Sequence, residues 1–189
     1  MSTSVTRRDF VQSSGAAGIA GFFSFLPAPS SGSASLNSDP DLVLDPDEGE
    51  VYLIGERQGR VTIKVDKRNK GVETLSLLTE DIVPGDGIPV HKHAAEEELI
   101  FVEDGRGVFT FGVDEYDVTP GSMALVPRGV WHGLRNEGDE ILRMVFGYTP
   151  AGFEDYFRAI GVRSGESWKG LTNEDWARIN AEFGITYRR

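Results

Sequence analysis

Short apolar runs, many of them alternating with polar residues, occupy most of the chain between residues 51 and 149. Alternation with a period of two is typical of β-strands that bury one face. Glycines or an Asn-Glu-Gly turn separate the runs, and many short strands with regular turns indicate an all-β sandwich or barrel. We predict strands over residues 51–54, 60–65, 73–82, 99–102, 107–111, 115–118, 123–126, 131–135 and 141–146.

Apolar residues recur at helical spacing in the last 40 residues, 150–189, and predict two short helices. Thr172 is followed three positions later by Asp175, an acidic variant of the capping box that begins a helix, and Gly184 can end that helix. We expect both helices to cover the barrel or to pack between two copies in a homodimer, without a catalytic role. Their apolar positions are Phe153, Tyr156, Phe157 and Ile160, then Trp176, Ile179 and Phe183.

The first 34 residues resemble an export signal of the twin-arginine type. The segment Thr6 to Val11 follows the S/T-R-R-x-F-L pattern closely, an apolar stretch covers residues 15–26, and small residues run from Ala28 to Ser35. This is the order of regions in a cleaved signal peptide. We therefore expect a signal peptide over residues 1–34, recognition by an export machinery, and a mature protein that is exported to a periplasmic or extracellular location.

An acidic surface is expected from the composition. The formal net charge is −11, the isoelectric point is about 4.7, and residues 35–50 hold six acids and no base, which predicts a disordered acidic linker. Such a surface repels nucleic acid and anionic membranes. Because the chain has no cysteine, disulfides, thiolate ligands and cysteine nucleophiles are excluded.

All three histidines of the chain lie in two segments that are also rich in glycine and proline. His91 and His93 are two residues apart, so on a strand both side chains project from the same face. Glu98 begins the next predicted strand and His132 comes from a later one. Three imidazoles and one carboxylate suit a divalent first-row transition metal, Fe, Mn, Ni, Co, Cu or Zn.

The two segments resemble the paired motifs of the cupin superfamily. The first, Gly85 to Gly105, reads G-x5-H-x-H-x4-E-x6-G, and the second, Gly121 to Asn136, reads G-x5-P-x-G-x2-H-x3-N. The resemblance implies a single cupin jelly-roll β-barrel over residues 51–149, followed by the helical extension over residues 150–189. It also implies that the family's metal ligands correspond to the three histidines and the glutamate named above.

A weaker resemblance suggests the chemistry. The segment Thr149 to Phe157 and the Phe183-Gly184-Ile185 ending are similar to the tail of small quercetinase-like cupins. This implies a metal-dependent, dioxygenase-like oxidoreductase that acts on a small phenolic or enolic substrate. A Lewis-acid isomerase, epimerase or lyase and a non-catalytic cupin that binds metal and ligand remain open alternatives.

Glu98 is the candidate catalytic residue, because a carboxylate can leave a metal and accept a proton from a substrate hydroxyl. The same residue can equally be a ligand only. Several bulky apolar side chains are candidates for the cavity wall around the metal. Strand alternation alone does not decide which of them face the interior. These candidates are Phe101, Phe109, Phe111, Met123, Trp131 and Met144.

Overall fold

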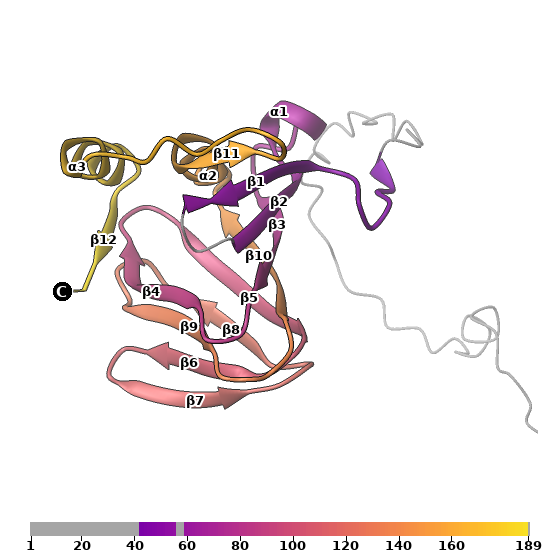
Figure 1. Ribbon diagram of the computed structural model, residues 1–189, viewed down its shortest axis with the longest axis vertical. Coiled ribbons are helices and arrows are strands. Elements are labelled where there is room, and N and C mark those ends of the chain that lie inside the picture. The colour runs from indigo at the N-terminus through magenta and orange to yellow at the C-terminus, as the bar shows by residue number, and fades with distance from the viewer. Residues whose placement is uncertain (1–41, 56–58, 189) are drawn as a thin grey trace, which may run out of the picture. The chain divides into compact units, whose positions relative to one another are not determined.

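Two antiparallel β-sheets enclose one apolar core in the computed structural model, which describes residues 42–55 and 59–188 (Figure 1). The predicted all-β fold with short helices is confirmed, whereas the predicted export signal lies outside the described residues. The strands are β1 (Glu50–Ile54), β2 (Gly59–Val65), β3 (Ser76–Ile82), β4 (Gly87–His93), β5 (Glu97–Asp104), β6 (Gly107–Phe111), β7 (Asp114–Val118), β8 (Met123–Val126), β9 (His132–Asn136), β10 (Leu142–Thr149), β11 (Gly161–Arg163) and β12 (Ile185–Tyr187). The helices are α1 (Lys67–Lys70), α2 (Glu154–Ile160) and α3 (Asn173–Glu182).

The larger sheet has the strand order β11-β1-β2-β3-β10-β5-β8, and the smaller sheet has the order β12-β4-β9-β6-β7. Strands from distant parts of the chain are therefore neighbours. In β3, for example, Ser76, Leu78, Glu80 and Ile82 are buried and the residues between them are not, so the strand has one inward face. The buried apolar side chains of both sheets form the core between them.

Three short elements were not predicted from the sequence pattern. Helix α1 buries none of its residues, so it lacks the apolar side chains at helical spacing by which a helix is recognised in a sequence. It begins with a capping box between Asp66 and Asn69. Strands β11 and β12 have three residues each, which is too short for alternation to be recognised. Both short strands pair at edges of the sheets, where they bring the C-terminal extension back to the barrel (Figure 1).

The C-terminal helices begin and end close to the predicted positions. Thr172 is the N-cap of α3 and exchanges the expected capping-box hydrogen bonds with Asp175. Phe183 is the C-cap, and Gly184 follows it with a φ of 62°. That left-handed conformation strains residues with a Cβ atom, which explains a glycine after the last turn.

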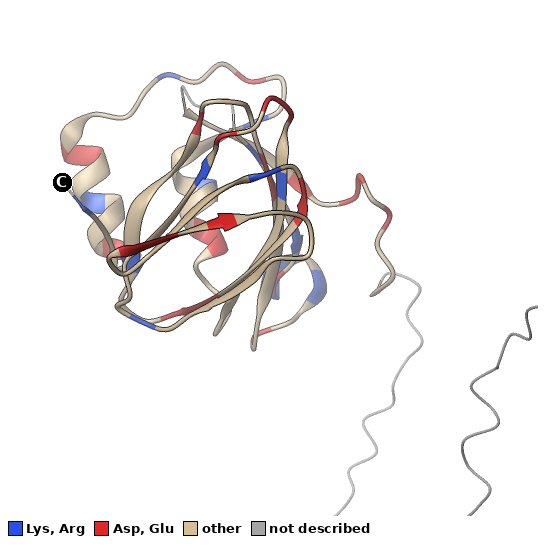
Figure 2. Cartoon of the chain, turned by 90° about the horizontal axis from the view of Figure 1, so that it is seen from below, with Lys and Arg blue, Asp and Glu red and all other residues tan. Residues whose placement is uncertain are grey.

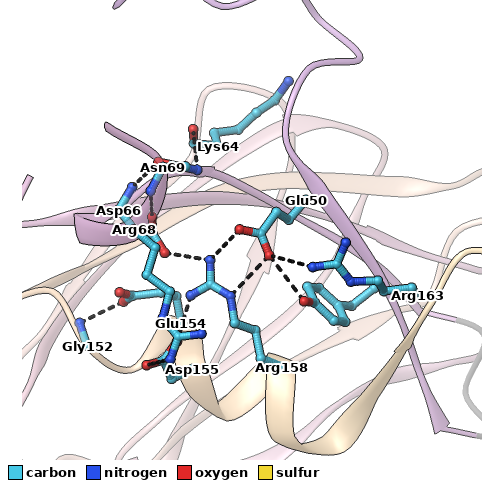
Figure 3. Close-up of polar contacts among 11 residues, drawn as sticks. Glu50, Lys64, Asp66, Arg68, Asn69, Gly152, Glu154, Asp155, Arg158 and Arg163 are labelled. Atoms are coloured by element: carbon cyan, nitrogen blue, oxygen red, sulfur yellow. Dashed lines mark hydrogen bonds and ion pairs between the residues drawn. The ribbon is translucent and has the colours of Figure 1, made fainter. Parts of the chain in front are cut away.

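A largely buried cluster of ion pairs connects α2 to β1 and to the start of α1 (Figure 3). The guanidinium of Arg158 lies 2.9 Å from Glu50 in β1, 2.6 Å from Asp66 at the start of α1, and 2.6 Å from Asp155 in α2. Asp66 is fully buried and the Arg158 side chain is only 9% exposed. The cluster therefore joins three segments that are far apart in the sequence.

Acidic and basic residues occur along strands and helices throughout the fold, as Figure 2 shows. Lys64 donates hydrogen bonds to the carbonyl oxygens of Asp45, Pro46 and Glu48, which ties the described end of the acidic segment to β2. The edge strand β7 is exposed and carries three acids among its five residues. Charge on an edge strand discourages pairing with another chain. No helix among residues 42–55 and 59–188 is long and apolar enough to cross a membrane.

Candidate metal centre

Strand β4 directs two histidines into the barrel. His91 and His93 are buried, whereas Lys92 between them is turned outward and lies 4.8 Å from the ring centre of Trp131. On the neighbouring strand β9, His132 pairs with His91 across the ladder. The three imidazoles consequently come from the inner face of the smaller sheet, as strand alternation predicts.

Glu98 reaches the same point from β5 in the opposite sheet. Its Oε2 atom lies 2.8 Å from Nε2 of His132 and 3.1 Å from Nε2 of His93. The two nearest nitrogens of His91 and His93 are also 3.1 Å apart. One potential ligand atom from each of the four side chains lies within 4.8 Å of every other, and all four residues are buried.

Hydrogen bonds to the backbone orient two of the rings. Nδ1 of His91 lies 2.8 Å from the carbonyl oxygen of Pro89, and Nδ1 of His132 lies 3.0 Å from that of Val130. A carbonyl oxygen only accepts, so each Nδ1 carries the hydrogen and donates it. In a neutral imidazole Nε2 then presents a lone pair, which is the form that binds a metal.

The donor set fits a divalent cation for an electrostatic reason. The lone pair of His132 Nε2 faces the carboxylate oxygen of Glu98, and two acceptors at 2.8 Å repel each other unless a positive charge lies between them. A first-row metal ion supplies that charge, and imidazole and carboxylate are ligands that such ions accept. The residues present therefore match the metal that the cupin motifs imply.

The ionisation states also agree with metal binding. Burial, together with the neighbouring His132, lowers the pKa of His91 to about 3, so this imidazole is neutral at pH 7. Burial acts to raise the pKa of Glu98, but hydrogen bonds and positive charge from His132 and His93, when these rings are protonated, outweigh burial and hold the pKa well below its ordinary value. A cation bound between the same groups acts in the same direction. Burial and the charge of Glu98 raise the pKa of the Tyr148 hydroxyl, which therefore remains a neutral phenol.

A cavity of about 690 Å³ adjoins the metal centre and includes His91 and Glu98 in its wall. A volume of this size accommodates a small organic ligand. Among the described residues that line it, none is a lysine or an arginine. The remaining polar groups in the wall are Glu80, Tyr148, Tyr156, Asn180 and Tyr187, and the other residues are glycine, proline or apolar and aromatic side chains from both the barrel and the C-terminal extension.

The expected cavity wall was largely wrong. Of the six candidate side chains only Met144 lines the cavity at the metal centre. Phe109, Phe111 and Met123 line a second cavity of about 390 Å³, and Phe101 and Trp131 line neither. Much of the wall comes instead from β10 and from the C-terminal extension. The aromatic spacing in α2 and α3 was interpreted only as the inner face of a cover, and β12 was not predicted.

Comparison with known proteins identifies the family. Residues 78–148 match the model of the cupin domain. An uncharacterized protein of Methanocaldococcus jannaschii is 33% identical over 88 residues, which cover 46% of this chain and 69% of that protein. The chain therefore belongs to the cupin family.

One further relative and two solved structures are similar to this chain. A quercetin 2,3-dioxygenase of Bacillus subtilis is 31% identical over 88 residues, which cover 47% of this chain and 25% of that enzyme. A predicted oxalate decarboxylase of Thermotoga maritima is similar with a TM-score of 0.51 at 19% identity, covering 57% of this chain and 98% of that one. A sugar phosphate isomerase of Silicibacter pomeroyi has a TM-score of 0.50 at 20% identity, covering 57% and 74%. At these identities the two structures show the fold alone.

Proposed function

We propose that the protein is a metal-dependent, dioxygenase-like oxidoreductase that acts on a small, uncharged phenolic or enolic molecule. The observation that carries this proposal is a buried set of three histidines and one glutamate that adjoins a mostly apolar and aromatic cavity through His91 and Glu98. Among the described residues, no lysine or arginine lines this cavity. The relative with quercetin dioxygenase activity in its name supports the same substrate class, although the alignment covers a quarter of that enzyme.

His91, His93, Glu98 and His132 would hold the metal. When bound, the ion supplies Lewis acidity toward a substrate oxygen and, if it is redox-active, the means to react with O2. The chain itself contributes the neutral imidazoles, the ionised carboxylate and a water-excluding aromatic wall around them. Tyr148 lies in the same wall, where burial and the charge of Glu98 raise the pKa of its hydroxyl and keep it a neutral phenol.

The charges around the cavity favour a neutral substrate. If the three histidines bind the ion as neutral ligands, Glu98 and a divalent ion give a net charge near +1, and the buried carboxyl of Glu80 lies in the cavity wall. A phosphorylated sugar normally requires lysine or arginine side chains for its phosphate, and the described part of the cavity wall contains neither. A phenol or enol needs only one oxygen at the metal and apolar contacts elsewhere.

Metal analysis combined with oxygen uptake tests the proposal. We expect protein purified from its native host to contain about one redox-active first-row metal per chain, and to consume O2 with at least one member of a phenolic and enolic panel. Zinc with substrate turnover but no O2 consumption would support the Lewis-acid isomerase, epimerase or lyase instead. Tight ligand capture without turnover would support a non-catalytic binding protein.

Replacing Glu98 by glutamine is expected to separate metal binding from turnover. Glutamine keeps the shape and an oxygen donor but loses the charge and basicity, so metal content should fall modestly while activity per bound metal falls about 100-fold. The measurement is turnover divided by metal content, with wild type as the reference. An unchanged ratio would leave Glu98 a ligand and exclude its role as a proton acceptor.

A further inference from the structure

The outer face of the larger sheet carries an exposed apolar patch on four neighbouring strands, β3, β10, β5 and β8. Core side chains alternate with outward ones along these strands. The register aligns the outward residues in two rows, which we call the outer patch: Leu77, Gly147, Leu99 and Leu125 in the first row, and Thr79, Val145, Phe101 and Met123 in the second. Within these two rows of the described strands, Thr79 is the one polar residue.

The size of the outer patch indicates a contact surface. In an antiparallel sheet that buries one face, the other face is normally polar. Here Met123 and Leu125 are 65% and 62% exposed, and Leu99 and Leu77 are 41% and 38% exposed. At about 200 Å² for a fully exposed leucine or methionine, these four residues present about 400 Å² of surface, a size that often marks an interaction site. A standard interface buries about 800 Å² per partner, of which about 60% is apolar, so the patch supplies most of the apolar area that a stable dimer needs.

The charges around the outer patch favour a second copy of this chain as its partner. The formal net charge is −11, so nucleic acid and anionic membranes are repelled. A basic partner is recognised by acidic side chains, and the two described rows contain none. Beyond the second row, Asp81 and Arg143 form an ion pair at 2.6 Å, and Glu103 is exposed on β5. A border with both signs is self-complementary, because a two-fold rotation can set the base of one copy against an acid of the other.

The C-terminal helices, where the sequence pattern also allowed a homodimer contact, use their apolar side chains within the chain. Most of these side chains belong to the core and the others pack against it: Phe153, Tyr156, Phe157, Ile160 and Ile179 in the core, and Trp176 and Phe183 beside it. The edge strand β7 carries acids that discourage association. The outer patch is therefore the apolar surface of the described fold that is best placed to meet a second copy.

We propose that the protein forms a two-fold symmetric homodimer in which the outer patch of one copy packs face to face on the outer patch of the other. Sheets that pack in this way lie about 10 Å apart and interdigitate their side chains. Leu99 is flanked by Gly147 and Leu125 in its row, so it lies near the two-fold axis. Because Leu99 follows Glu98 on β5 and faces the opposite way, the interface packs against the back of the strand that carries the candidate glutamate ligand.

Sedimentation equilibrium of the full-length protein tests the proposal. We expect wild type to be a dimer with a dissociation constant of about 1 μM or lower, within the range of interfaces of standard size. Leu125→Glu should raise this constant about 100-fold or more, because it places a charge against apolar surface and near other acids. Leu125 is largely exposed in one copy, so the fold should tolerate the change.

Val113→Glu is the matched control. Val113 is 88% exposed in the turn between β6 and β7, outside the outer patch, and its replacement adds the same charge. This variant should keep the dissociation constant within about threefold of wild type, since solvent screens an exposed charge. Thermal unfolding and metal content, measured for every variant, report damage to the fold or to the metal centre.

A charge exchange at Leu99 tests the two-fold axis itself. Leu99→Glu and Leu99→Lys should each be monomeric at about 10 μM, because like charges meet near the axis, whereas an equimolar mixture should form heterodimers. A different protein as the partner predicts no such recovery. The proposal is overturned by a monomeric wild type at about 100 μM, by a dimer that Leu125→Glu weakens no more than Val113→Glu, or by a mixture that associates no better than either Leu99 variant alone.

Discussion

Replacing His132 by alanine is expected to remove most of the metal that the protein binds. The substitution deletes one of four ligands and leaves Glu98 without the imidazole that lies 2.8 Å from its Oε2 atom. A chelate that loses a ligand binds more weakly, and the opened position admits water that competes for the ion. The check is metal per chain after dialysis, measured by elemental analysis for wild type, His132→Ala and His91→Ala.

Lys92→Ala is the matched control for this experiment. Lys92 lies on the same strand between His91 and His93, but its side chain faces away from the metal centre and contacts Trp131. This variant should keep the wild-type metal content, and its thermal unfolding reports any general damage to β4. Full metal content in both histidine variants would show that these histidines are not ligands.

Replacing Arg158 by methionine is expected to lower the free energy of unfolding by about 3–5 kcal/mol, the cost of removing one partner from a buried ion pair. Asp66 is fully buried and lies 2.6 Å from the guanidinium, so the substitution leaves its charge without compensation. Glu50 and Asp155 lose their contacts with the same group. Urea denaturation followed by circular dichroism, with linear extrapolation, measures the change.

Two exposed arginines that pair with the same acids serve as controls. Arg68 lies 2.7 Å from Asp155 and Arg163 lies 3.7 Å from Glu50, and their side chains are 60% and 65% exposed. Arg68→Met and Arg163→Met should each cost less than about 1 kcal/mol, because solvent screens exposed pairs. A loss in Arg158→Met no larger than in these controls would mean that burial of the cluster adds no stability.

Local sequence patterns determined most of the barrel and the members of the candidate metal centre. Alternation placed His91 and His93 on one face of a strand, and the capping box at Thr172 marked the start of α3. The fixed spacing of the two motifs assigned Glu98 and His132 to the same set of candidate metal ligands. These features were predictable because each depends on residues a few positions apart, or on a motif with fixed spacing.

Only the tertiary structure decided what surrounds that set. The pairing of β12 with β4 places Tyr187 beside His91, although these two residues are 96 positions apart in the chain. Arg158 meets Glu50 and Asp66 for the same reason, and the buried side of β3 turns Glu80 into the cavity. Such contacts arise from strand order and packing between distant segments, which periods of 2 and 3.6 residues do not encode. The sequence therefore specified the candidate ligands, and the fold of the C-terminal extension decided the wall that faces them.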